Sequence, residues 1–132
     1  MYNIIQTLSF YYTSHAIVYH FLYFIGLIPS TKYIAYTVLI FSQILNYIYP
    51  KYISITNNNN KIKYLLIDFC AHILPGLILF YYNHNKIPFI DLTTVSILLF
   101  SLILYFWYIY IYSKKSIVDI YINNNPFKIF DI

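Results

Sequence analysis

The residues of this sequence that could do chemistry are ionisable and amide side chains set inside long apolar stretches. Asp68 and His72 are four positions apart, so on a helix they lie about 40° apart on one face. A carboxylate one turn from an imidazole holds the ring in one tautomer and raises its basicity. This pair is typical of a proton relay or an oriented metal ligand. The structural alternative is that Asp68 lies within two turns of a membrane interface and reaches water.

A proline follows this pair. Pro75 cannot donate a hydrogen bond to the carbonyl of Ala71. We therefore expect the backbone to open beside His72.

The two preceding apolar stretches carry further polar side chains. Gln43 and Asn46 are three positions apart and share a helix face. Amides in such positions commonly hydrogen-bond across helices, so we interpret this pair as helix-packing residues. His15 and His20 are five positions apart and diverge by about 140° on a helix. These two histidines cannot both face one site.

The positions of these residues within their stretches predict two polar layers. On antiparallel helices, one layer near mid-helix contains His20, Gln43 and His72, and Ser101 lies near the middle of the last stretch. A second layer, one turn inward, contains His15, Asn46 and Asp68. We interpret the pattern as a hydrogen-bonded core that fixes helix pairing, and on that interpretation His72→Leu should be tolerated. The alternative is that His20 and His72 ligate a haem b from both faces. No other metal site and no catalytic residue is assigned.

The elements that must position these residues are long apolar stretches. A run of about 17 to 25 residues without charge is typical of a transmembrane helix. Four stretches meet this description closely enough to be predicted as spans, at 10–28, 33–49, 64–82 and 93–113. The sequence therefore predicts an all-α membrane protein of a single domain, 1–132, with its helices in two antiparallel hairpins.

The lysines predict an orientation, because basic loops are retained on the inner side of a membrane. Six of the eight lysines lie in the polar loop 50–63 and the tail 114–132, and the two others, Lys32 and Lys86, lie in the short hairpin turns. We expect both termini on the inner side. The asparagine run 57–60 predicts a flexible, solvated loop. The tail is too short and broken for a fifth span, so we expect it at the inner interface or against a partner.

Composition limits the class of protein. Charged residues make up 9% of the chain and hydrophobic residues 61%, whereas a soluble domain has roughly 25% charged residues. Lipid is therefore the expected surroundings of most of the surface. The net charge of +4 comes from lysines scattered between apolar runs, which does not fit a nucleic-acid-binding face. The many Ile, Tyr, Asn, Phe and Lys residues, with no Arg or Glu, indicate an AT-rich genome.

Motifs for other chemistry are missing from the sequence, including a phosphate-binding loop and a C-x-x-C or H-E-x-x-H pair. We expect a structural or accessory subunit of a membrane complex, or a viral membrane component, with membrane-protein partners or a second copy of the chain. The alternative is a redox or proton-handling anchor subunit that uses His20 and His72 with haem or quinone. A transporter or channel is the weaker third class, because four short spans hold little polar surface. The membrane could be an organelle inner membrane, a host or virion membrane, or a plasma membrane.

Overall fold

The computed structural model describes residues 4–49, 58–83 and 91–123, and every regular element within them is a helix. The α-helices are α1 Ile4–Ser9, α2 Tyr12–Phe24, α3 Lys32–Ile48, α4 Asn58–Asp68, α5 Leu74–Asn83 and α6 Leu92–Tyr112. Two π-helical segments are η2 Phe69–Ile73 and η3 Asp119–Asn123. The predicted all-α class is confirmed.

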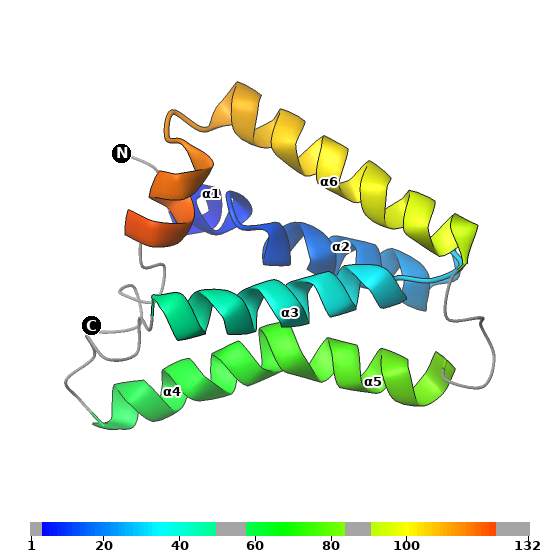
Figure 1. The fold of residues 1–132 in the computed structure, drawn as a ribbon, viewed down its shortest axis with the longest axis horizontal. Coiled ribbons are helices and arrows are strands. Elements are labelled where there is room, and N and C mark those ends of the chain that lie inside the picture. The colour runs from blue at the N-terminus through cyan, green and yellow to red at the C-terminus, as the bar shows by residue number, and fades with distance from the viewer. Residues whose placement is uncertain (1–3, 50–57, 84–90, 124–132) are drawn as a thin grey trace.

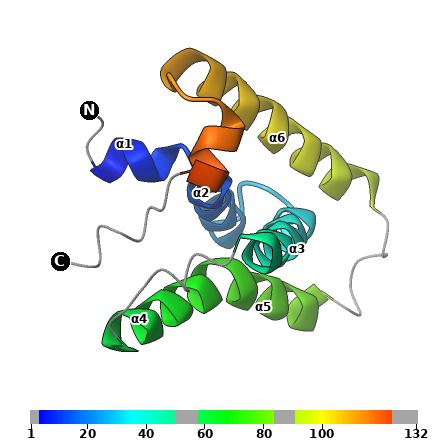
Figure 2. The same cartoon turned by 60° about the vertical axis from the view of Figure 1, so that its left-hand side comes forward.

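Helix α3 lies at the centre of the arrangement (Figures 1 and 2) and contacts α2, α6 and the α4–η2–α5 segment. Helix α3 runs antiparallel to α2, the segments α4, η2 and α5 form one bent rod below α3 that runs antiparallel to it, and α6 runs back again (Figure 1). Helix α1, the end of α3, the start of α4 and η3 all lie at one end of the molecule, which we call the basic end (Figure 1). The described lysines 61, 63, 114 and 115 lie on the segments at this end.

The first predicted span, 10–28, is shorter in the structure. Helix α2 has 13 residues and is therefore about 20 Å long. It ends at Phe24 because Gly26 adopts φ +84°, a left-handed conformation that glycine tolerates without strain. The amide of Gly26 donates to the carbonyl of Tyr23, and that of Leu27 donates to Leu22, five residues back. These two bonds are the Schellman pattern that terminates helices.

The start of α2 is a break in the chain rather than a helix that continues from α1. Tyr11 is extended, with φ −97° and ψ 136°, so the last carbonyls of α1 need partners outside the helix. Ser14 Oγ donates to the carbonyl of Leu8 at 2.6 Å, and His15 Nε2 donates to that of Ser9 at 2.8 Å. His15 is therefore a capping residue of α1.

The third predicted span, 64–82, begins earlier than expected. Helix α4 starts at Asn58, so 58–63 is helical and the prediction of a polar loop over 50–63 is wrong for that part. Residues 50–57, including Asn57, lie outside the described part of the chain. The expected opening of the backbone before Pro75 is confirmed, because 69–73 is π-helical and the amide of Leu74 bonds to the carbonyl of Phe69. A wider turn accommodates the proline ring and its missing donor.

The second and fourth predicted spans, 33–49 and 93–113, each agree with a helix to within one residue. Helix α6 has a clear start, since the Asp91 carboxylate accepts from the Thr94 hydroxyl at 2.6 Å and from the Thr94 amide at 3.3 Å. This is an N-cap. The Thr94 hydrogen bonds hold the pKa of Asp91 below its usual value.

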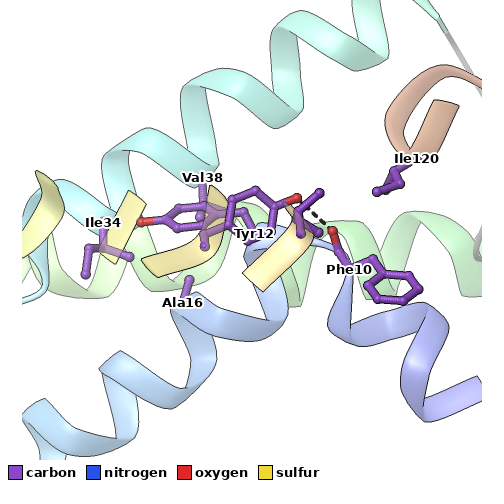
Figure 3. Close-up of a cluster of buried hydrophobic side chains, with 8 residues drawn as sticks. Phe10, Tyr12, Ala16, Ile34, Val38 and Ile120 are labelled. Carbon is purple, nitrogen blue, oxygen red and sulfur yellow. Dashed lines mark hydrogen bonds between the residues drawn. The ribbon is translucent and has the colours of Figure 1, made fainter. Parts of the chain in front are cut away.

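The buried core lies where α2, α3, α6 and the C-terminal tail meet (Figure 3). Its fully buried members are Phe10, Tyr12, Ala16, Ile34, Val38, Tyr105, Ile109 and Ile120. Ile120 belongs to the tail and is 1% exposed, and Ile117 and Tyr121 pack around the same cluster, so this part of the tail packs against the chain itself. We expected the tail 114–132 at an interface or against a partner, and its last nine residues, 124–132, lie outside the described part.

Most of the surface around this core is apolar. Phe24 on α2, Phe41 on α3, Phe80 on α5 and Phe100 on α6 are all at least 60% exposed. Two segments are long and apolar enough to cross a membrane, Asn58–Tyr81 and Leu92–Tyr112, and in each the apolar window is only 22% buried. The core helix of a soluble protein would be mostly covered. By length and composition, these two are the candidate membrane spans among the described helices.

Candidate functional site

Asp68 is the centre of a hydrogen-bonded polar network that joins three helical segments. The Nδ1 atom of His72 lies 2.7 Å from Asp68 Oδ1, and Asn46 Nδ2 lies 3.3 Å from both carboxylate oxygens. Tyr64 donates its hydroxyl to Asn46 Oδ1 at 3.2 Å, and Thr13 Oγ1 lies 3.0 Å from His72 Nε2. The network thus links α2, α3 and the α4–η2 segment. Asp68 itself is 7% exposed.

The direction of each proton follows from the acceptor at the centre. An ionised carboxylate only accepts, so the Asn46 amide and His72 Nδ1 both donate to Asp68. In a neutral imidazole the other nitrogen is then an acceptor, so the Thr13 hydroxyl donates to His72 Nε2. Every hydrogen in the network points toward Asp68, which satisfies a carboxylate that would otherwise be costly to bury.

Local backbone structure holds the network in place. Asp68 and His72 are one turn apart, and the π-helical turn between them keeps both side chains on the side of α3. The α5 segment packs on α3 just beyond this turn, where Gly76 lies beside the Leu39 side chain and the carbonyl of Ala35. Small residues at helix contacts permit such packing.

An open groove borders the network on the surface between α3 and the α4–η2 segment. Its volume is about 560 Å³, and its lining residues are Gln43, Asn46, Tyr47, Tyr64, Leu65, Asp68, Phe69 and Ile73. The groove lining therefore combines polar side chains with aromatic and aliphatic ones. Gln43 is exposed, and among the described residues its side-chain amide has no hydrogen-bond partner.

His20 lies in a separate place. Its Nδ1 atom is 2.8 Å from Thr31 Oγ1 at the start of α3, so it latches α2 to α3 at the end opposite the basic end. His72 instead contacts Thr13, which is seven residues, or about 10 Å of helix, from His20. The contacts differ from the predicted layer of His20, Gln43 and His72, because α2 is shorter than the assumed span and His72 faces its first turn.

A shared haem does not fit this arrangement. Both ring nitrogens of His72 are engaged by Asp68 and Thr13, and His20 bonds Thr31 about two turns away along α2. The described residues also include no cluster of three or more His, Cys, Asp or Glu that could hold a metal ion. The five predicted core residues thus divide into a network of Asn46, Asp68 and His72, a neighbouring Gln43, and a separate His20.

A second polar cluster, which sequence reasoning missed, closes the break between α1 and α2. The Tyr105 hydroxyl donates to the Phe10 carbonyl at 2.7 Å (dashed in Figure 3), and the Tyr12 amide donates to the Tyr121 hydroxyl at 2.8 Å. Since the single proton of Tyr105 is used, Tyr121 donates at the 3.0 Å contact between the two hydroxyls. Burial raises the pKa of Tyr121. The signal in the sequence is Tyr121 in the tail, which does not stand out because the chain holds 18 tyrosines.

The buried Ser101 belongs to the same region. Its hydroxyl donates to the carbonyl of Leu98 at 2.7 Å, so the Tyr12 hydroxyl donates to Ser101 at 2.6 Å. Ser101 was expected near mid-helix beside the other polar residues. In the structure it contacts Tyr12 and is fully buried between α2 and α6.

Comparison of the chain with models of protein families, with curated proteins and with solved structures found no match. The functional argument therefore rests on the residues and contacts described above.

Proposed function

We propose that this chain is a multi-pass integral membrane protein with a structural or accessory role, such as a small subunit of a membrane complex or a viral membrane component. The observation that carries the proposal is that apolar side chains lie on the outside of the helices and polar side chains lie between them, the reverse of a soluble protein. Large apolar side chains on α2, α3, α5 and α6 face outward, while Asp68, Asn46 and His72 are paired inside. Lipid is the solvent in which this arrangement is favourable.

The proposed topology has four spans with both described chain ends on the inner side. Lys61, Lys63, Lys114 and Lys115 lie at the basic end and are at least partly exposed, as the positive-inside rule requires of an inner face. Lys32, at the other end, is 5% exposed. Helix α2, at about 20 Å, is shorter than the roughly 30 Å hydrocarbon core. The bilayer would thin locally beside it, and α1 and η3 would lie at the inner interface.

Reporter fusions test this topology. A reporter placed at Lys61 and one placed at the C-terminus should report the same side of the membrane, and one inserted at Lys32 should report the other. The protein should also stay with the membrane after alkaline carbonate extraction. Opposite sides for the first two reporters would exclude the four-span topology, and release by carbonate would exclude an integral protein.

A native gel of gently solubilised membranes tests the accessory role. The chain should migrate in an assembly larger than itself, and its deletion should reduce the amount of that assembly. A chain that migrates alone, and whose deletion changes no other membrane assembly, would contradict this role.

Proton handling is the second candidate, and the 2.7 Å contact between the two titratable side chains His72 and Asp68 inside the helices favours it. A positioned imidazole and carboxylate can pass a proton between them. Vesicles that contain the purified protein and an internal pH-sensitive dye would take up protons under an imposed potential. The isosteric Asp68→Asn variant should abolish this uptake. Equal uptake by Asp68→Asn and by the original chain would exclude the relay.

A further inference from the structure

The groove between α3 and the α4–η2 segment holds a polar group that the described residues leave unsatisfied. The Gln43 amide is exposed and has no partner among the described residues. In water this would be ordinary, but in a lipid environment an unpaired amide is strongly unfavourable. Its neighbours Asn46 and Asp68, in contrast, are paired within the network.

Asp68 also retains acceptor capacity toward the same groove. A carboxylate offers about four acceptor positions, and the described contacts are one from His72 and a shared pair from Asn46. The groove therefore presents an acceptor at Asp68 beside an amide at Gln43 that can both donate and accept. A molecule with a hydroxyl group could donate to the first and accept from the second.

The depth of the groove in the proposed membrane limits which hydroxyl-bearing molecules can reach it. Asp68 is five residues beyond Lys63 on the same helical rod, or about 7 Å further from the basic end. A charged phospholipid head group stays at the interface, because moving it into the hydrocarbon would strip its water. An uncharged head group can reach this depth. Its apolar body would contact Tyr47, Leu65 and Phe69, which line the groove.

We propose that this groove binds an uncharged, membrane-soluble molecule whose ring bears a hydroxyl group, the chemistry that quinols and sterols share. The hydroxyl donates to Asp68 and accepts from the Gln43 amide, the ring lies against the aromatic walls, and the apolar remainder extends into lipid. The groove volume of about 560 Å³ falls within the roughly 300–1,000 Å³ range of small-molecule sites. The inference rests on the proposed membrane location and is independent of the accessory role.

Equilibrium binding to the full chain in lipid nanodiscs tests the proposal. Radiolabelled decylubiquinol and cholesterol are the two probes, and decylubiquinone and cholesteryl methyl ether are their counterparts without a hydroxyl. We expect saturable binding of one probe, and we expect the affinity for its counterpart without the hydroxyl to be at least tenfold weaker. Saturation by decylubiquinol alone assigns a quinol site, and saturation by cholesterol alone assigns a sterol site. Absence of saturable binding for both probes overturns the proposal.

Two variants locate the site, and both alter exposed positions, so the fold should persist. Gln43→Leu removes the amide, and we expect at least a tenfold loss of affinity. Leu65→Trp fills the groove while it leaves Asp68 and Gln43 in place, and we expect binding to be lost. Ser96→Ala, on the exposed face of α6, is the matched control and should bind normally. Unchanged affinity in both Gln43→Leu and Leu65→Trp would overturn the assignment to this groove.

Two further outcomes separate the alternatives. A Gln43→Cys variant, made after the single native cysteine is replaced by serine, tests whether a second copy of the chain covers this face. If this variant forms disulfide-linked dimers and the original chain binds neither probe, the face is a contact between two copies and the ligand site is overturned. If the proposed membrane location is wrong, the protein will separate from lipid on flotation, and this result is distinct from a failure of the ligand site. Failure of the ligand site alone leaves the protein in the nanodisc without saturable binding.

Discussion

Removal of His72 alone should destabilise the protein, although the sequence predicted that His72→Leu would be tolerated. In the structure His72 provides the shortest hydrogen bond to Asp68, at 2.7 Å, and Asp68 is 7% exposed. Leucine in its place leaves the carboxylate with only the two 3.3 Å contacts from Asn46. An under-satisfied buried group costs about 1–3 kcal/mol, and a charged one costs more. We expect a loss of about 2–3 kcal/mol in the free energy of unfolding.

The partner substitutions make the reasoning testable. Asp68→Leu leaves the His72 Nδ1–H and the Asn46 amide without their acceptor, so it should also cost about 1–3 kcal/mol. The double variant, with leucine at both positions, replaces a hydrogen-bonded pair by two apolar side chains, so it should cost about as much as one single change, roughly 2 kcal/mol, rather than the sum of the two. The two substitutions should therefore be coupled by about 2 kcal/mol in the stabilising direction.

Unfolding in mixed micelles, followed by circular dichroism for all four proteins, measures this cycle. Ser96→Ala serves as the control for a helix-surface change and should unfold as the original protein does. If the double variant loses the sum of the two single effects, the pair is not coupled, and the network around Asp68 is refuted. Full tolerance of His72→Leu would contradict the burial of an ionised Asp68.

Three further predictions concern the arrangement of the helices. In a background where the native cysteine is serine, cysteines at 13 and 72 should crosslink in membranes, because Thr13 contacts His72. Cysteines at 20 and 72 should not crosslink, and the reverse result would restore the layer predicted from the sequence. Gly26→Ala should lower the free energy of unfolding by roughly 1–2 kcal/mol, since it forces a Cβ into a left-handed conformation, and an unchanged thermal unfolding curve would contradict the turn. Leu99→Lys should cost about 2.5–3.5 kcal/mol in a translocon insertion assay, and normal insertion would exclude a span at α6.

The boundaries of α3 and α6 were predictable because their ends carry explicit signals. Asp91 followed by Thr94 caps the start of α6, and Pro50 follows α3 at the position where a helix stops. The end of α2 was missed because Gly26 was read as part of an apolar run. A glycine three residues before Pro29 was the available signal, since glycine is the usual residue of a left-handed helix end.

The candidate site was predictable in part for a similar reason. Asp68 and His72 lie on one continuous helical rod, so their spacing alone predicted the contact. The pairing between helices depends on the axial shift of each helix, and a shift of a few residues moves a side chain by about 5 Å. The position of each residue along its helix predicted that Asn46 lies beside Asp68, and the structure has this contact. The same count predicted that His20 lies beside His72, whereas His72 contacts Thr13 instead. The asparagines at 58–60 predicted a loop because the run is polar and of low complexity, whereas in the structure the helix of the apolar residues that follow extends back over them.

The tyrosine contacts across the break between α1 and α2 impose an order on biogenesis. The Phe10 carbonyl and the Tyr12 amide emerge from the ribosome early, but their partners, Tyr105 and Tyr121, are synthesised 95 and 109 residues later. Until then, these two backbone groups lack the Tyr105 and Tyr121 hydroxyls as hydrogen-bond partners. The first hairpin therefore cannot reach its final state before the last segment arrives, and a chain released early would expose this gap to quality-control proteases. The tail residue Tyr121 thus completes the entrance to α2.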